Sequence, residues 1–321
     1  MRIIYLILFY SMISCNQQAQ ENETSKEELE LLAKKELESS DSGSKLQVMD
    51  VVKIDTVSDI AKGIDERSPA FIKDRLQKLV GNYLKTKCVE NSIQYPPKFI
   101  LYRFFKQDRE FEVWAGNSQN DSLCRILLLP VCAVDDQPGT KLQEGDGKTP
   151  EGFYHAQIQF GSTADFMWIK LNNSEIATYG KVGYGSSFKM CLDYPNSLDR
   201  LQTKTILKDK SPGSAICIHG NCVSIGCISF ENKNYLPVFL SALYHDRKNY
   251  GPIKIHVFPF RFENITMEER QKFANNVSHM SEKQVLDNWS NLEKAHALFN
   301  QKRRAIKINI QKDKYSYSIQ N

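Results

Sequence analysis

The sequence predicts an α+β fold, in which a long run of β-strands is flanked by helices on both sides. Apolar residues recur at helical spacing over residues 71–84. From Tyr95 to about residue 262, short apolar runs alternate with Gly- and Pro-containing turns, which is typical of strands. After Thr266 the helical spacing returns. Because strands and helices form separate runs along the chain, we expect an α+β architecture.

The predicted elements follow in chain order. Ser68-Pro69 begins a helix, since proline is favoured at the first helical position. Gln107-Asp108-Arg109 separates two apolar runs and predicts a hairpin. The strand candidates are Phe99–Phe105, Glu110–Trp114, Arg125–Ala133, Gly152–Gln159, Met167–Leu171, Ala215–His219, Gly226–Phe230 and Ile253–Phe258. The later helix candidates are Lys233–His245, Met267–His279 and Glu282–Phe299, and Ile306–Ile319 is predicted as a last strand.

Composition and charge narrow the class of protein. The 321 residues, 41% hydrophobic and 25% charged, fit a globular protein with one large domain or two small ones. The net charge of +4 is small and scattered, so no nucleic-acid partner is expected. No stretch beyond the N-terminus is long and apolar enough to span a bilayer.

The first residues are typical of an export signal. Arg2 precedes an apolar run, and Met12-Ile13-Ser14-Cys15 resembles a bacterial lipobox. We therefore expect cleavage before Cys15, lipidation of its sulfur, and an exported lipoprotein held on a membrane in the periplasm. An ordinary signal peptide and a buried apolar start are the alternatives. Residues 16–65 are polar and poor in aromatic residues, which predicts a tether.

Export places the cysteines in an oxidising compartment. Apart from Cys15 and Cys227, the chain has cysteines at 88, 124, 132, 191, 217 and 222. Six cysteines allow fifteen pairings, and the sequence does not choose among them. A reversible disulfide between Cys222 and Cys227 is one further hypothesis.

Residues 216–229 combine histidine, glycine, serine and cysteine. A cysteine attacks as its thiolate, and an ordinary thiol is only a few per cent ionised at neutral pH, so a neighbouring imidazole must accept the proton. A further group must orient that imidazole, and N–H donors must face the oxyanion of the intermediate. His219, at the end of an apolar run, and Cys227, after a short loop, are the candidate base and nucleophile.

Two glycines complete this candidate site. The Gly220 carbonyl is a candidate to hold the tautomer of His219. The Gly226 N–H, with that of Cys227, is the candidate oxyanion hole. The alternatives are a core histidine, a structural cysteine, and a zinc site. No metal is expected, because the cysteines around His219 lack paired Cys-x-x-Cys spacing.

These residues form a recognisable pattern. His219-Gly220 is followed by Ser224-Ile225-Gly226-Cys227, and GDGKTPEGFY (145–154) and Tyr194-Pro195-Asn196 lie upstream. In order and separation, the three segments resemble the signatures of the L,D-transpeptidase (YkuD-type) catalytic domains. The resemblance covers roughly residues 97–262. The His-Gly-x-Cys-x-Ser-Ile-Gly-Cys variant, with the later strand His256–Phe260 and with Trp289, is similar to the YafK-type subgroup.

The resemblance implies a β-sandwich-like mixed sheet with flanking helices and a helical C-terminal appendage. It implies Cys227 as nucleophile and His219 as proton acceptor and donor. Gly220 would orient His219, and Ser224 would shape the loop or support the oxyanion. No cofactor is expected, since thiol, imidazole and backbone dipoles suffice for acyl transfer. The family also implies covalent trapping by carbapenems.

The expected organisation is a lipoprotein signal at 1–15, a tether at 16–65, a helix with a lead-in segment at 66–96, a catalytic region at 97–262 and a helical extension at 263–321. The resemblance implies a peptidoglycan L,D-transpeptidase that forms a cysteinyl thioester with stem peptides. Many family members have histidine and arginine where Ile225 and Ser229 stand here, which leaves the acyl acceptor open. A hydrolase of the same class, acting on stem peptides or releasing an attached lipoprotein, and a non-catalytic peptidoglycan-binding lipoprotein are the alternatives.

Several other polar residues are weaker candidates. His256 lies in an apolar strand and is interpreted as a core histidine, and the pair Asp135-Asp136 as solvated. Basic residues that could bind substrate carboxylates, with surface charge as the simpler interpretation, are Lys170, Lys181, Lys189 and Arg200.

Overall fold

The computed structural model describes residues 69–159, 168–172, 175–179, 189–220, 222–244 and 252–319. All of these belong to one compact unit, Thr56–Asn321. The predicted signal and tether, including Cys15, lie outside the described residues and stay predictions. Within the described ranges, no helix has the length and apolar character needed to cross a membrane.

A mixed sheet of eight strands forms the centre of the described fold, in the order β3-β2-β1-β10-β4-β7-β8-β9. The β1–β10 and β8–β9 pairs are parallel, and the other pairs are antiparallel. The strands are β1 (Phe99–Phe105), β2 (Glu110–Gly116), β3 (Cys124–Pro130), β4 (Gly152–Gln159), β7 (Lys189–Leu192), β8 (Cys217–Gly220), β9 (Ile228–Phe230) and β10 (Ile253–Phe258). Separate hairpins are β5 (Trp168–Asn172) with β6 (Glu175–Tyr179), and β11 (Ile306–Gln311) with β12 (Lys314–Ile319).

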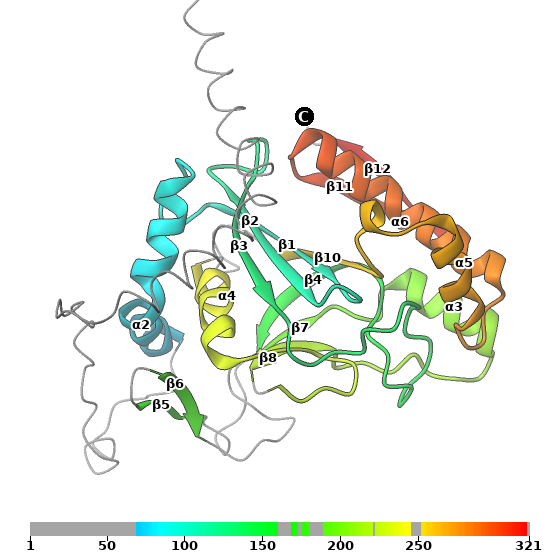
Figure 1. The fold of residues 1–321 in the computed structure, drawn as a ribbon, viewed down its shortest axis with the longest axis horizontal. Helices are drawn as coiled ribbons and strands as arrows, with labels where there is room; N and C mark the ends of the chain where they lie inside the picture. The colour runs from blue at the N-terminus through cyan, green and yellow to red at the C-terminus, as the bar shows by residue number, and fades with distance from the viewer. Residues whose placement is uncertain are drawn as a thin grey trace, which may run out of the picture. The chain divides into compact units, whose positions relative to one another are not determined.

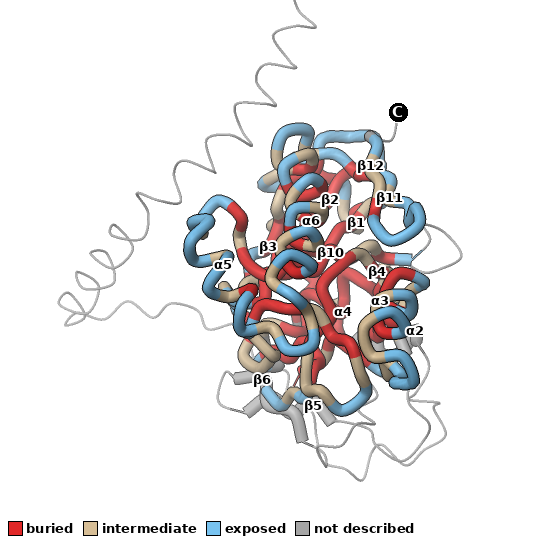
Figure 2. Tube along the Cα trace, turned by 90° about the vertical axis from the view of Figure 1, so that its right-hand side faces the viewer, coloured by how far each residue is buried: buried red, intermediate tan, exposed pale blue. Residues whose placement is uncertain are grey.

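Helices cover both faces of this sheet (Figure 1). Figure 1 shows α2 and α4 together on one side of the sheet, and α5 and α6 on the other. Buried residues are concentrated along the strands and along α4 (Figure 2). The helices are α2 (Pro69–Glu90), α3 (Ser197–Leu207), α4 (Asn232–Tyr244), α5 (Met267–Asn275) and α6 (Glu282–Lys302).

Strand β1 explains this layering. Every residue of β1 after Phe99 is buried, and successive side chains of a strand point to opposite faces. The Tyr102 hydroxyl donates to the Val238 carbonyl of α4, at 3.0 Å. Leu101, one residue earlier, belongs to the apolar cluster that includes Phe299 of α6. A strand that is apolar on both faces therefore has a helix on each.

The α+β class and the mixed sheet are confirmed, and three strands, β1, β4 and β10, have the predicted bounds. The sandwich-like arrangement of the sheet stays a prediction. The prediction of one strand over Ile306–Ile319 is wrong, because the chain turns at Lys312, which has a φ of +57°, and forms the β11–β12 hairpin. Strands β6 and β7 and helix α3 were not predicted from the sequence.

Candidate active site

Adjacent strands place the predicted nucleophile beside the predicted base. In the parallel β8–β9 pair, Ile218 lies opposite Ile228, so Cys227, just before β9, lies opposite Cys217. His219 is two residues beyond Cys217 on β8. Alternate residues of a strand share one face, and directly opposed residues do the same. His219 and Cys227 therefore lie on neighbouring strands and on one face of the sheet.

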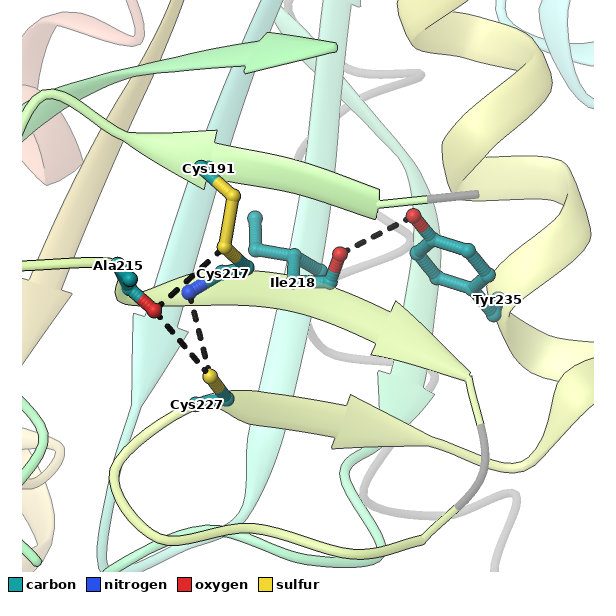
Figure 3. The surroundings of a disulfide bond; sticks show 6 residues. All are labelled: Cys191, Ala215, Cys217, Ile218, Cys227 and Tyr235. Carbon is teal, nitrogen blue, oxygen red and sulfur yellow. Dashed lines mark hydrogen bonds between the residues drawn. A yellow bond between two sulfur atoms is a disulfide. The ribbon is translucent and has the colours of Figure 1, made fainter. Parts of the chain in front are cut away.

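Cys227 is a free thiol, and its side chain is buried. The Cys217 N–H donates to its Sγ at 3.4 Å, and the thiol lies 3.7 Å from the Ala215 carbonyl oxygen (Figure 3). Burial raises the pKa of Cys227, while the Cys217 N–H and the positive charges of Lys189 and Lys141 act in the opposite direction. The thiol is therefore protonated at neutral pH, but its surroundings already favour the anion formed when a base removes the proton.

His219 is held by the next residue in the chain. Its Nδ1 lies 2.5 Å from the Gly220 carbonyl oxygen. A carbonyl only accepts hydrogen bonds, so Nδ1 carries the proton and Nε2 is free to accept one. Burial lowers the pKa of His219, the Gly220 carbonyl opposes this effect, and the charge of Lys189 lowers the pKa further. The ring is therefore a neutral base at pH 7.

The described contacts include no direct hydrogen bond between the His219 ring and Cys227 Sγ. In substrate-free enzymes such bonds are often long and shorten only in the complex. Lys189 lies directly across from His219 in the β7–β8 pair. Its charge acts on the His219 ring, whereas Arg200 is exposed on α3. The Lys170 side chain and Lys181 lie outside the described residues.

Ser224 closes the loop that leads to the nucleophile. Its Oγ donates to the Cys227 carbonyl at 2.6 Å and accepts from the Gly226 N–H at 3.0 Å. The Gly226 N–H is thus already bonded within the loop. In this conformation the N–H is therefore directed at Ser224 Oγ, and its role in the oxyanion hole stays a prediction.

Gly226 is required here for a different reason. Its φ is +122°, and a Cβ at this position would lie 2.7 Å from the Lys148 carbonyl oxygen. An L-residue would therefore be strained and would also clash with backbone. The close approach joins the 145–154 segment to the loop, and the Thr149 hydroxyl donates to the Gly226 carbonyl at 2.9 Å. Two signatures that are distant in sequence thus form one structural unit.

Asp146, the acidic residue near the start of the 145–154 segment, has a structural role. Its carboxylate accepts the N–H groups of Leu142, Gln143 and Lys148. It also pairs with Lys141 at 2.7 Å. Burial raises the pKa of Asp146, but the Lys141 bond and the N–H groups outweigh this effect and the pKa is lowered. Asp146 therefore stays ionised and fixes the turn that precedes Thr149.

The remaining cysteines are mostly half-cystines. Disulfides join Cys132 to Cys222 and Cys191 to Cys217. Cys124 is also disulfide-bonded, and Cys88 is a free, buried thiol. The hypothesis of a Cys222–Cys227 disulfide is therefore wrong in this structure. The cysteine–histidine zinc set considered from the sequence loses Cys217 and Cys222 to disulfides, and no other metal-binding group occurs among the described residues.

Other sequence candidates are structural. His256 is buried, and burial lowers its pKa well below the usual range, which agrees with a core histidine. Asp136 pairs with Arg109 at 2.6 Å, and Asp135 lies 3.4 Å from Lys148, so these carboxylates are ion-paired rather than simply solvated. A pocket with an empty volume of about 460 Å³, partly open to solvent, lies between α3, α6 and β12 and includes neither His219 nor Cys227.

Comparison with known proteins identifies relatives. No family model matches the chain. Proteins of Escherichia coli K12 and O157:H7, each named "Putative L,D-transpeptidase YafK", are 23% identical over 222 residues, which covers 68% of this chain and 74% of theirs.

Solved structures give a weaker likeness. The helical cell shape determining protein Pgp2 of Campylobacter jejuni is 15% identical, with 76% of this chain and 81% of that chain covered and a TM-score of 0.33. Bd1075 of Bdellovibrio bacteriovorus is 16% identical, with 71% and 79% covered and a TM-score of 0.30. The chain is thus similar to proteins named "Putative L,D-transpeptidase YafK", and it carries the three signature segments described above.

Proposed function

We propose that this protein is a peptidoglycan L,D-transpeptidase that forms a thioester between Cys227 and a stem peptide. The supporting observation is the free Cys227 thiol, which accepts a backbone N–H on the strand next to a neutral His219. The relatives named "Putative L,D-transpeptidase YafK" support the same class of reaction. No cofactor is part of the proposal.

The first half-reaction forms the acyl-enzyme. His219 Nε2 removes the Cys227 proton as the sulfur attacks the stem-peptide carbonyl, and the carbonyl oxygen becomes an oxyanion. The intermediate then collapses and the peptide C–N bond breaks. His219 returns its proton to the departing amine. The Gly220 carbonyl, 2.5 Å from Nδ1, keeps Nε2 available for both transfers.

The second half-reaction determines the product. An acceptor amine attacks the thioester, loses its proton to His219, and displaces the Cys227 thiolate, which is reprotonated. The product is then a new crosslink. If water attacks instead, the product is a carboxylate and the protein is a hydrolase. We further propose that the chain is exported, lipidated at Cys15 and anchored to a membrane facing the cell wall, with a tether (16–65) before the catalytic region (97–262).

Muropeptides provide the test. The purified protein is incubated with a muropeptide mixture and with sacculi that carry covalently attached lipoprotein, and products are identified by mass spectrometry. We expect crosslinked dimers. Trimmed monomers or released lipoprotein would indicate the hydrolase, and unchanged substrate with retained binding would indicate a non-catalytic protein. A carbapenem adduct mapped to Cys227, and missing from Cys227→Ala, would show the acylating thiol directly.

Lipidation is tested separately. Expressed with its own N-terminus in a bacterium that lipidates exported proteins, the chain is expected to fractionate with membranes, and its processed N-terminal peptide is expected to carry diacylglycerol. A Cys15→Ser variant is expected to lose both properties. Unmodified Cys15 in the exported wild-type protein would contradict the anchor but not the catalytic proposal.

A further inference from the structure

The peptide unit between Gly226 and Cys227 is fixed from outside the loop. A trans peptide is planar, and its C=O and N–H point in opposite directions. The Thr149 hydroxyl holds the Gly226 carbonyl at 2.9 Å. That contact therefore also sets the direction of the Cys227 N–H, which belongs to the same peptide. A hydroxyl on one segment thus orients a donor on the nucleophile itself.

The Cys227 N–H has no partner among the described contacts of this loop. Ser224 binds the preceding N–H, that of Gly226, and the following carbonyl, that of Cys227. The N–H of the nucleophile is a common oxyanion donor in acyl transfer, because it is rigidly connected to the attacking atom. The stabilisation that this N–H gives an oxyanion depends on its direction, since hydrogen bonds weaken steeply when they are poorly aligned.

Thr149 is itself held by buried charge. Its side chain is fully buried. The Lys106 ammonium, also fully buried, donates to the Thr149 carbonyl at 3.1 Å and to the Gly139 carbonyl at 2.8 Å. Lys106 also pairs with Glu151 at 3.1 Å. The backbone that carries the Thr149 hydroxyl is thus anchored by a cation that water does not reach.

Glu151 extends this anchor to the C-terminal helix. One carboxylate oxygen accepts the Gly139 N–H at 2.6 Å, and the other accepts the Trp289 Nε1–H of α6 at 2.9 Å. Glu151 and Trp289 are both buried. A continuous set of contacts therefore leads from α6 through Glu151, Lys106 and Thr149 to the Gly226 carbonyl.

We infer that Thr149 is a positioning residue, which directs the Cys227 N–H at the oxyanion of the tetrahedral intermediate. The buried contacts of Lys106, Glu151 and Trp289 hold it in place. This inference rests on the proposed function, because only acyl transfer produces the oxyanion. On this inference, the contact between the 145–154 segment and the loop before Cys227 orients a hydrogen-bond donor. Helix α6 then supports catalysis without contacting the substrate.

The experiment uses two matched pairs of variants in the full chain. The first pair is the wild type and Thr149→Val, in which a methyl group replaces the hydroxyl. The second pair is Thr149→Ser and Thr149→Ala, which also differ by the hydroxyl but have smaller side chains. For each protein we would measure the turnover of the muropeptide that the wild type consumes and the pH profile of Cys227 alkylation by iodoacetamide. Alkylation needs the thiolate but no oxyanion hole, so it reports loop integrity independently.

We expect the hydroxyl to separate both pairs. Thr149→Val and Thr149→Ala should lower kcat by about 10- to 100-fold, with little change in KM. The loss should be smaller than that caused by deleting an oxyanion donor, because here the donor is only misdirected. Thr149→Ser should retain kcat within about threefold, since serine keeps the hydroxyl donor. The pH profile of alkylation should be the same in all four proteins. If Thr149→Val does not fold, the Ser and Ala pair decides.

Three results would overturn the inference. The first is equal kcat within both pairs. The second is a loss of alkylation in parallel with turnover, which would mean that the hydroxyl only keeps the loop folded. The third is a Ser variant as slow as Ala. A wild-type protein that leaves every muropeptide unchanged would instead overturn the proposed function, and the inference with it.

Discussion

Two free, buried thiols in this protein have very different surroundings. Cys88 lies on α2 and is fully buried, and burial alone raises the pKa of its thiol to about 11. Cys227 is also buried, and burial raises its pKa too, but the Cys217 N–H and the charges of Lys189 and Lys141 oppose the rise. Only Cys227 thus has groups that stabilise its anion.

The difference shows that burial does not separate a structural thiol from a nucleophile. What separates them is the presence of donors and positive charge around the sulfur, together with a base on the neighbouring strand. None of the described groups offsets the burial of the Cys88 anion, so the thiol behaves as a small apolar side chain. Removing the sulfur, the base or the nearby positive charge should therefore have effects of different size.

The largest effect is expected from the two cysteines themselves. Cys227→Ala should lower muropeptide turnover by at least about 10⁴-fold, because a nucleophile cannot be replaced by water at the same rate. Cys88→Ala should leave turnover within about twofold, since α2 contributes no described group to the site. Turnover is followed by liquid chromatography with mass spectrometry. Residual activity above one per cent in Cys227→Ala would contradict the thioester.

His219 should have the next largest effect. His219→Gln removes the proton acceptor and should lower kcat by about 10²- to 10⁴-fold. The exposed His279 provides the control, as His279→Asn at its positive φ should be neutral.

The pH dependence of activity follows from the direction of the His219 pKa shift. A base works when unprotonated, and burial lowers the pKa of His219 below its usual value. Activity of the wild type should therefore persist below pH 6.5 and fall only as the pH drops through the lowered pKa. An acid limb centred above pH 6.5 would show that the base is another group, or that His219 is not buried in solution.

The sequence was most informative where one local pattern carries the information. The strands β1, β4 and β10 are read from apolar runs that need no partner to be recognised. His219, Gly220, Ser224 and Cys227 lie within nine residues of one another, so a motif identifies them together. Strand β7 has only four residues, which is too short a run to predict from sequence. Helix α3 begins with an Asn196–Asp199 capping box, a less usual signal that was not recognised.

What the sequence did not predict depends on contacts between distant residues. Thr149 and Gly226 are 77 positions apart, and Lys106 and Glu151 are 45 apart. The disulfides join residues separated by 90 and by 26 positions, which no spacing rule selects among six cysteines. The Gly226 N–H was predicted to face the oxyanion, whereas in the structure it donates to Ser224 Oγ. That partner is set by the Ser224 side-chain conformation, which the sequence does not encode locally.

A smaller effect is expected at Lys189. Its positive charge lowers the pKa of both Cys227 and His219. Lys189→Gln should therefore raise both pKa values, so that the alkylation profile of Cys227 moves to higher pH and the acid limb of turnover also moves up. The change in rate at pH 7 should be only about two- to fivefold, as expected for a partly solvated charge.

The control for Lys189 is an equally charged residue away from the site. Lys204→Gln, exposed on α3, removes the same charge from the surface and should shift neither profile. If both lysine variants shift the profiles equally, the shift is caused by net charge and not by the position of Lys189. The charge of Lys189 would then not help to distinguish Cys227 from Cys88. If Lys189→Gln abolishes turnover, Lys189 contacts substrate directly.

The smallest functional effect, and a purely structural one, is expected at Cys88. Cys88→Ala removes a buried sulfur and should lower the free energy of unfolding by about 1–2 kcal/mol, with a fall in Tm of a few degrees. Peptide mapping after iodoacetamide should find Cys227 labelled in the folded protein and Cys88 labelled only after denaturation. Labelling of folded Cys88 as fast as Cys227 would show that the α2 thiol is accessible, and the donors around Cys227 would then no longer distinguish the nucleophile.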